Sequence, residues 1–288
     1  MKRSDFNRIL VATDGSKASQ AALGLAASLA RPCGASVELV HVWNLEVHHR
    51  HGVWDVETRH EARSLIDESL IRLRAEGVEA RGEIMHADTD HVAAAIAEAA
   101  REFGADLVVV GSTGLSDWQS LIQHSVTHQL LSAVDCPMLI VRGESRTHGN
   151  DALRVLLAIA GGDDIIPGVR AAAAAAFAPG SAVLLLHVAQ VIFGAQGFAY
   201  VEPSQEISAT ITEATARLRD AGITTEAVVA HSGNVAQVIA EMAESWQADV
   251  IVTGSSRIGD LGSILFGSVT HKLLRATETP VLVAERSR

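Results

Sequence analysis

Two loops rich in glycine and serine carry residue types that could bind phosphate. One follows an apolar run that ends at Gly111, and the other follows a similar run that ends at Gly254. Both runs are too apolar and β-branched for an edge strand, so each loop should leave the carboxyl end of a buried strand, where ligands of open α/β sheets bind. A helix then starts near Ser125 or Ser268, and its N-terminal N–H groups and dipole favour an anion. The sequence therefore predicts two phosphate-binding loops.

The two loops belong to an internal repeat. Residues 105–141 recur as residues 248–284 at a constant offset of 143. Each copy reads as an apolar strand, a loop, a helix and a second apolar strand that follows a proline. The match continues upstream, where residues 91–106 align with residues 234–249 at the same offset. The repeat therefore covers whole domains.

The elements that must position these loops alternate between strands and helices. Residues 8–13 form a short apolar strand, and Asp14 leads from it into a helix. Four further strands alternate with helices, which gives the order β-α-β-α-β-α-β-α-β in each copy. This order predicts an α/β fold of two repeated, doubly wound domains, each with a five-stranded parallel sheet. We expect the domains to span residues 1–145 and 152–288, with a polar linker at about residues 142–152.

Two segments are expected to be irregular loops. Residues 43–53 are polar and rich in histidine, and residues 189–202 hold the matching place in the second copy. The histidines of the first loop, with His60 nearby, could ligate a divalent metal, since imidazole suits zinc and nickel. A solvated loop is the favoured alternative, because adjacent histidines do not share a helical face and no cysteine joins them.

Other histidines also have both a functional and a structural interpretation. Residues 86–91 contain two imidazoles and two carboxylates at the ligand edge, which could hold a cation or act as acid and base. However, Thr89 or Asp90 also fits the N-cap of the helix that follows. His41 and His187 lie at matching places on buried strands, and we interpret them as core histidines with satisfied hydrogen bonds.

Composition excludes several classes of function. The 288 residues include 23 Lys and Arg against 34 Asp and Glu, a net charge of −11, which argues against a nucleic acid or an anionic membrane as partner. No apolar run approaches the roughly 18 residues of a membrane span, and the first residues lack a signal-peptide pattern, so we expect a cytoplasmic protein. Cys33 and Cys136 lack metal-ligand spacing and are expected to be reduced and structural.

Taken together, these motifs resemble the universal stress protein family in its tandem two-domain form. The resemblance rests on Asp14-Gly15-Ser16 after strand one, on residues 40–42 of strand two and on the loop pattern G-x2-G-x9-G-[ST], and it covers essentially the whole chain. It implies a Rossmann-like fold that binds ATP or a related adenine nucleotide, with Mg²⁺ as a companion of ATP. In the family, the strand-one aspartate contacts ribose and a main-chain group after strand two holds adenine. The glycine loop wraps the phosphates, and the last strand mediates pairing of domains.

The resemblance implies one set of nucleotide contacts in each copy. The residues are Asp14, Val42, Gly111, Gly114, Ser125 and Val126 in the first copy, and Gly254, Arg257, Gly267, Ser268 and Val269 in the second.

Both sets depart from the family pattern. His124 replaces the third glycine of the first loop, Arg257 replaces the second glycine of the second loop, and Ala160 stands at the aspartate position. A side chain forced to positive φ costs about 1–3 kcal/mol. A cationic Arg257 or His124 would return a charge-assisted hydrogen bond worth about 1.5–3 kcal/mol. We expect the first copy to bind more tightly, because it keeps Asp14.

The sequence contains no dedicated catalytic motif. It has no GxxxxGK[ST] loop, no GxGxxG after a strand, no GxSxG elbow and no HExxH, so we expect slow ATP hydrolysis at most. The leading interpretation is a stress-response regulatory protein that binds adenine nucleotide. The alternatives are a nucleotide-independent interaction or dimerisation module with degenerate sites, and a weak nucleotide hydrolase.

The last strands of the two copies predict how the protein assembles. Residues 138–141 and 281–283 are apolar and would otherwise form exposed sheet edges. We expect the two copies to pair within one chain about a pseudo-twofold axis, with a homodimer as a further form of assembly.

Overall fold

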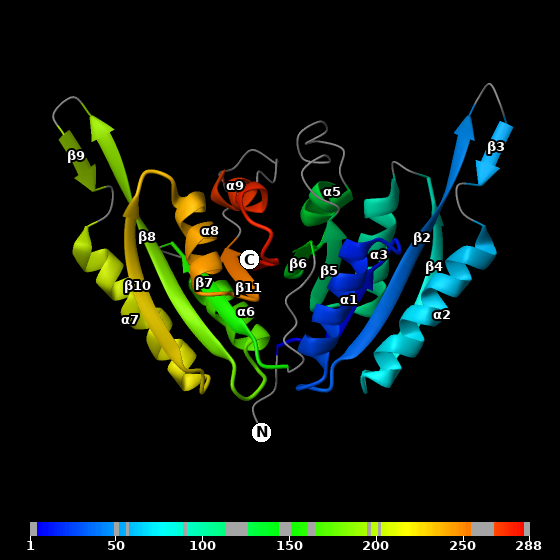
Figure 1. Cartoon of the computed structure of the whole chain (residues 1–288), viewed down its shortest axis with the longest axis horizontal. Coiled ribbons are helices and arrows are strands. Elements are labelled where there is room, and N and C mark those ends of the chain that lie inside the picture. Colours follow the sequence, from blue (N-terminus) through cyan, green and yellow to red (C-terminus); the bar gives the residue numbers. More distant parts are fainter. Residues whose placement is uncertain are drawn as a thin grey trace. The chain divides into compact units, whose positions relative to one another are not determined.

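The computed structural model divides the chain into two compact units with one plan (Figure 1). One unit spans Phe6–Thr147, and the other is built on His148–Arg288. The structure describes residues 5–48, 52–55, 58–88, 91–112, 126–143, 151–160, 165–194, 197–200, 203–254 and 268–284. Both units are α/β folds with a parallel sheet, which confirms the predicted fold class.

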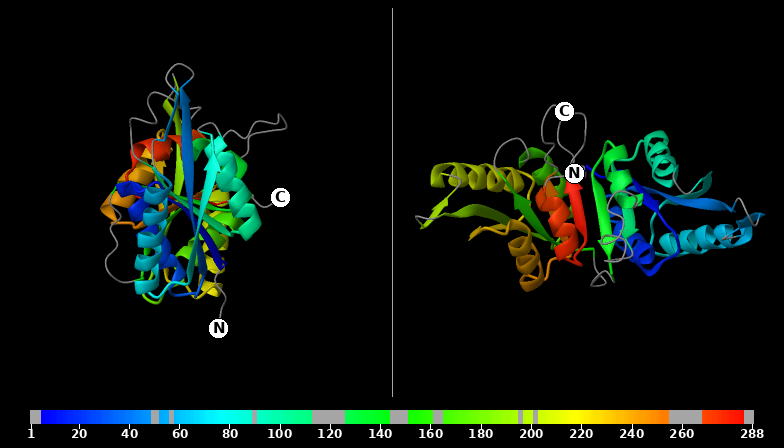
Figure 2. Two further views of the ribbon diagram at one scale, coloured as in Figure 1. Left: turned by 90° about the vertical axis from the view of Figure 1, so that its right-hand side faces the viewer. Right: turned by 90° about the horizontal axis from the view of Figure 1, so that it is seen from above.

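The first unit has helices on both faces of its sheet. The strand order β4-β2-β1-β5-β6 is parallel throughout. Because crossovers are right-handed, α1 and α2 cover one face of the sheet and α3 and α5 cover the other (Figure 2). The contacts between helices agree with this arrangement, since α1 packs against α2 and α3 packs against α5. The elements are β1 (Arg8–Ala12), α1 (Lys17–Ala30), β2 (Ser36–His48), β3 (Gly52–Asp55), α2 (Arg59–Ala75), β4 (Ala80–Ala87), α3 (Val92–Phe103), β5 (Leu107–Ser112), α5 (Val126–Ala133) and β6 (Met138–Arg142).

The second unit repeats this plan with the parallel order β10-β8-β7-β11-β12. Helices α6 and α7 pack on one face, and α8 and α9 pack on the other. The elements are β7 (Arg154–Ile159), α6 (Ile165–Ala175), β8 (Ala182–Gly194), β9 (Gly197–Tyr200), α7 (Ser204–Asp220), β10 (Thr225–Ser232), α8 (Val235–Ser245), β11 (Val250–Gly254), α9 (Ser268–Ala276) and β12 (Val281–Ala284).

The central strands are apolar because helices cover both of their faces. In β1, Ile9, Leu10 and Val11 are completely buried, and in β11 Ile251 and Val252 are completely buried as well. Burial of each such side chain contributes about 1.5–3 kcal/mol to folding. In these two strands the polar residues therefore lie near the strand ends.

The helix ends follow local sequence rules at most positions. Thr58 and Glu61 form a capping box at the start of α2. Gly104 ends α3 with a φ of 68°, the left-handed conformation that glycine adopts without strain. Gln247 follows α8 at the matching place and has a φ of 54°, the only positive φ of a non-glycine residue in the described ranges.

None of the described helices is both long and apolar enough to cross a membrane.

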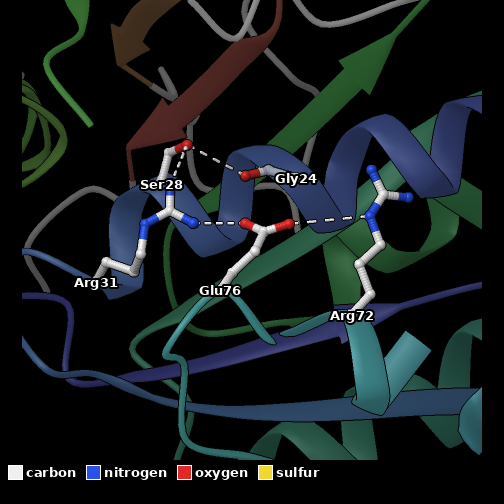
Figure 3. Close-up of polar contacts among 5 residues, drawn as sticks. All are labelled: Gly24, Ser28, Arg31, Arg72 and Glu76. Carbon is white, nitrogen blue, oxygen red and sulfur yellow. Dashed lines mark hydrogen bonds and ion pairs between the residues drawn. The ribbon is translucent and has the colours of Figure 1, made fainter. Parts of the chain in front are cut away.

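An ion pair joins the C-terminal ends of α1 and α2 (Figure 3). Arg31 Nη1 lies 2.5 Å from Glu76 Oε2, and Arg72 Nε lies 3.9 Å from Glu76 Oε1. Arg31 Nη2 also donates to Ser28 Oγ at 3.4 Å, and Ser28 Oγ donates to the Gly24 carbonyl at 3.3 Å. Partly exposed pairs of this kind are worth about 1 kcal/mol or less. Both helices run antiparallel to the strands, so this contact lies at the sheet edge away from the carboxyl ends.

The prediction of irregular loops after the second strands is wrong, because both segments contain β-hairpins. β2 pairs antiparallel with β3, with Val47 opposite Val53. β8 pairs with β9 in the same way, with Phe193 opposite Phe198 (Figure 1). Polar residues dominate residues 43–53, whereas residues 189–202 are mostly apolar. Both segments contain β-branched and aromatic residues, which suit a two-stranded arm. The polar composition of the first segment was therefore a poor guide to its structure.

The predicted cap of α3 is also wrong. The N-cap is His91, and its side chain makes no capping hydrogen bond. Thr89 and Asp90, which the sequence favoured for this role, lie outside the described residues. The His91 N–H donates to the Asp88 carbonyl at 2.8 Å, a backbone hydrogen bond at the start of the helix.

Candidate functional site

The first unit forms a hydrogen-bonded turn at the carboxyl end of β1. The Thr13 N–H donates to the Val40 carbonyl at 2.9 Å, after which the chain leaves the sheet. The Ser16 N–H donates to Asp14 Oδ1 at 2.9 Å. Ser16 Oγ accepts from the Ser19 N–H at 3.2 Å as the N-cap of α1. These short polar side chains stabilise the turn, which holds Asp14 at the ligand edge of the sheet.

The hydroxyl of Thr13 connects this turn to α1. Thr13 Oγ1 donates to Ser19 Oγ at 3.2 Å and accepts from the Gly15 N–H at 3.3 Å. Gly15 has a φ of 77°, which only glycine adopts without strain. The sequence-based interpretation missed Thr13 and Ser19. Their signal was the group of small hydroxyl residues around Asp14, a pattern typical of capped turns.

The turn also lowers the pKa of Asp14. Partial burial acts to raise the pKa of its carboxyl group, but hydrogen bonds from the side chains of Ser16 and Ser19 and from backbone N–H groups outweigh it. The pKa therefore lies below its ordinary value. At neutral pH Asp14 is an exposed carboxylate that can accept hydrogen bonds from hydroxyl groups.

β2 continues past the end of β1 and carries backbone groups on the side that β1 has left. The register of β1 against β2 ends at Ala12 opposite Val40. Val42 lies two residues beyond Val40, so its N–H and C=O point to the same side, toward the position that β1 has left. The described hydrogen bonds include none from Val42 to β1 or its turn. The Val42 N–H and C=O therefore face the side of β2 from which the chain turns away toward Asp14.

Gly111, at the end of β5, packs against the backbone of α1. A Cβ atom at Gly111 would lie 2.4 Å from the Ser19 nitrogen and 2.5 Å from the Ala18 carbonyl carbon. Real Cβ atoms do not approach backbone so closely, so any larger residue would displace the helix. The packing of α1 on β5 therefore requires glycine at position 111 whether or not a ligand binds.

This plan, repeated along the chain, matches one known family. The model of the universal stress protein family matches residues 5–142 and again residues 153–285. The chain belongs to the universal stress protein family. The two matches confirm the tandem form that the sequence motifs predicted.

Similar proteins agree with this assignment. Universal stress protein YxiE of Bacillus subtilis (strain 168) is 30% identical over 155 residues, which cover 48% of this chain and 99% of that protein. The crystal structure of a universal stress protein from Archaeoglobus fulgidus DSM 4304 has a TM-score of 0.66 at 19% identity and covers 98% of this chain and 99% of its own. The functionally unknown protein PA1789 from Pseudomonas aeruginosa PAO1 has a TM-score of 0.66 at 17% identity, with 98% and 93% covered. At these identities, the two solved structures show the shared fold.

The second universal stress protein unit ends its first strand differently. β7 stays in register as far as Ile159, which pairs with His187, and Ala160 follows as an exposed residue. At the end of β11, the Thr270 hydroxyl donates to the Gly254 carbonyl at 3.3 Å and joins the start of α9 to the strand. This edge therefore has a polar link between strand and helix but no carboxylate at the aspartate position.

The structure describes only part of each predicted set of contacts. Asp14 follows the carboxyl end of β1 and Gly111 lies near that of β5, whereas Val42 lies within β2, just past the point where its pairing with β1 ends. Val126 and Ser268 are the first residues of α5 and α9, and Val269 follows in α9. The predicted residues Gly114, Ser125, Arg257 and Gly267 lie outside the described residues, together with His124.

A separate hollow of about 730 Å³ lies between the start of α2, β4 and Trp43. The rings of Trp43 and His86 meet edge to face, with centroids 5.4 Å apart. Arg63, in its wall, already pairs with Asp67 at 3.1 Å, so the hollow does not present a simple excess of positive charge. Its described lining residues are Trp43, Arg59, His60, Arg63, Gly82, Glu83, Ile84, Met85 and His86.

The histidines considered as metal ligands are only partly described. His60 lies exposed in α2, whereas His49 and His51 lie outside the described residues. Among the residues that the structure describes, no group of three or more His, Cys, Asp and Glu side chains is arranged to hold a metal ion. The metal interpretation gains no support from this part of the chain.

Proposed function

We propose that this universal stress protein is a regulatory protein that binds ATP or a related adenine nucleotide in its first unit, without dedicated catalysis. The observation that carries the proposal is the turn at the end of β1, which holds an ionised Asp14 where β1 leaves its neighbour β2. Before any ligand binds, the carboxylate is already ordered by its own hydrogen bonds. Such preorganisation lowers the entropy cost of binding.

The proposed contacts follow from the chemistry of these groups. Asp14 would accept hydrogen bonds from the ribose hydroxyls, and the Val42 N–H and C=O would pair with the donor and acceptor edge of adenine. The loop after Gly111, with Gly114, Ser125 and the start of α5 at Val126, would receive the phosphates, with Mg²⁺ as their counter-ion. In the second unit Gly254, Arg257, Gly267, Ser268 and Val269 would form a weaker site.

Nucleotide carried through purification tests this proposal directly. The full chain is purified under native conditions without added nucleotide, denatured, and its supernatant analysed by absorbance and mass. We expect an adenine nucleotide at up to one equivalent per chain. Calorimetric titration of the emptied protein should then give ATP binding that Asp14→Ala weakens. Steady release of phosphate that Asp14→Ala abolishes would instead favour a slow nucleotide hydrolase.

A nucleotide-independent interaction module is the second candidate, and one observation favours it. Gly111 is required by its contact with the backbone of α1 whether or not a phosphate binds. A retained glycine is therefore compatible with a site that has lost its ligand. A chain that carries no nucleotide through purification and shows no heat with ATP, ADP or AMP would support this candidate.

We also propose that the two units pair within the chain through β6 and β12, as their apolar sequences predict. We further propose that the chain forms a homodimer and that it is located in the cytoplasm. Light scattering of the full chain distinguishes a monomer from a homodimer.

A further inference from the structure

We infer that His41 is a positioning residue that orients Asp14 and thereby determines the preference of the nucleotide site for ribose. The inference rests on the proposed nucleotide binding and assigns a role to a residue that the sequence classed as core. His41 is only 5% exposed, and its Nδ1 lies 2.8 Å from the Thr13 carbonyl oxygen. Because a carbonyl oxygen only accepts hydrogen bonds, Nδ1 must carry the proton.

The contact acts on Asp14 through the peptide bond. The Thr13 carbonyl and the Asp14 N–H belong to one planar unit, so the direction of the carbonyl also sets the direction of the Asp14 backbone. The Thr13 N–H is held by the Val40 carbonyl at 2.9 Å. β2 therefore holds Thr13 at both ends, with a main-chain group on one side and the His41 side chain on the other.

The position of this contact explains why a histidine side chain is needed. The register of β1 and β2 ends at Ala12 opposite Val40, so the strand ladder does not extend to the Thr13 carbonyl. A buried carbonyl without a partner costs about as much as a lost hydrogen bond. The imidazole supplies that bond while β1 turns away to place Asp14. Val42, the proposed adenine contact, is the next residue on the same strand.

His187 offers a matched control within the same chain. It is 1% exposed and occupies the equivalent place on β8, in register with Ile159 of β7. The residue after Ile159 is Ala160, so this unit has no carboxylate for a histidine to orient. Loss of His187 would report the general cost of removing a buried strand histidine.

The test compares ATP with 2′-deoxyATP and 3′-deoxyATP by calorimetry on the full chain. We expect His41→Leu to lower ATP affinity about two- to tenfold, the effect of one hydrogen bond, and to reduce the preference for ATP over both deoxy analogues. His41→Asn should keep the preference, because its amide nitrogen can donate from nearly the Nδ1 position. His187→Leu should change neither quantity.

A double-mutant cycle separates positioning from a structural role. In an Asp14→Ala background, His41→Leu should cause no further loss of ATP affinity, because the group that it orients is already gone. If His41→Leu weakens ATP and both deoxy analogues equally, or loses the same affinity with and without Asp14, the inference is wrong. Should His41→Leu fold poorly, His41→Gln places its amide one bond too far and serves as the second variant.

A ligand-free measurement distinguishes failure of this inference from failure of the proposed function. The pKa of Asp14, followed by NMR in the absence of nucleotide, should rise toward its ordinary value in His41→Leu as the turn loosens, and should stay low in His41→Asn. Wild-type protein that binds no nucleotide but shows this rise would refute the proposed function and retain the positioning role. An unchanged Asp14 pKa in His41→Leu would refute the positioning role itself.

Discussion

The carboxyl ends of β1 and β7 show how one fold carries a polar turn in one unit and an apolar strand end in the other. In the first unit, the hydroxyl of Thr13 bonds to Ser19 and the chain turns away with Asp14. In the second unit, the matching residue is Ile159, which continues the strand in register before Ala160. Isoleucine offers no hydroxyl to bond with the following helix. The candidate site therefore depends on a few side chains at a strand end, while the sheet itself stays the same.

The amino ends of the same strands are alike in the two units. Asp106 accepts from the Arg8 N–H at 3.0 Å, and Asp249 accepts from the Arg154 N–H at 2.7 Å. In both units the guanidinium group of that arginine also lies over an aromatic ring at the C-terminal end of α3 or α8. The units thus keep the contacts that hold the sheet together and differ at the edge where ligands bind.

The largest effect is expected where α1 touches β5. Gly111→Ala should lower the free energy of unfolding by about 3 kcal/mol, because its Cβ would overlap the backbone at Ser19. Gly24→Ala is the control on the same helix, since nothing lies within 4 Å of a Cβ there, and it should stabilise by up to about 1 kcal/mol. Urea unfolding measures both.

The matching change at Gly254 sharpens this comparison. An equal loss in Gly254→Ala would mean that the second unit packs its first helix as tightly as the first unit does. Gly111→Ala protein that is as stable as the Gly24→Ala control would contradict the close contact described for β5.

The next effect concerns which unit binds nucleotide. Asp14→Ala should weaken ATP binding about ten- to hundredfold, the loss of a charge-assisted hydrogen bond. Arg257→Ala should have a smaller effect on ATP affinity, and Ala160→Asp should strengthen ATP binding by the second unit. Calorimetric titration measures all three. Unchanged affinity in Asp14→Ala, with binding abolished in Arg257→Ala, would place the working site in the second unit.

A buried carboxylate provides the third way to test the comparison. Glu38 is 5% exposed and pairs with Arg81, whose pKa is raised by the Glu38 hydrogen bond and charge; Leu184 holds the matching place in the second unit. Arg81→Ala should cost about 2 kcal/mol, because it leaves Glu38 buried without its partner. Glu38→Leu, which copies the second unit, should be nearly neutral. Thermal unfolding decides, and a larger loss in Glu38→Leu than in Arg81→Ala would contradict this reasoning.

The smallest effect is expected after α8. Gln247 has a φ of 54° where the first unit has Gly104 with a φ of 68°. Gln247→Gly should therefore stabilise the chain by about 0.5–1 kcal/mol through relief of backbone strain. Gly104→Ala is the opposite change and should destabilise. Chemical unfolding of both variants checks the pair, and a loss of stability in Gln247→Gly would overturn it.

The sequence by itself determined the repeat, the strands and most helices. The predicted alternation of strands and helices is present in both units. The buried strands were equally clear, because strands covered on both faces must be apolar along their whole length. The hairpins β2–β3 and β8–β9 were missed, since the returning strands β3 and β9 have only four residues each and a strand that short leaves a weak local signal. The placement of Asp14 and Gly111 at one sheet edge followed from the alternation of strands and helices alone.

Only the tertiary structure decided how the candidate site is held in place. The bond from His41 to the Thr13 carbonyl joins residues 28 positions apart, and the contact of Gly111 with Ser19 joins two elements that are far apart in the chain. Neither has a signature in neighbouring residues. A histidine on a buried strand and a glycine at a strand end each fit several roles in sequence. Which role each one takes depends on where β1 leaves the sheet and how closely α1 packs on it, and those distances exist only once the strands are assembled.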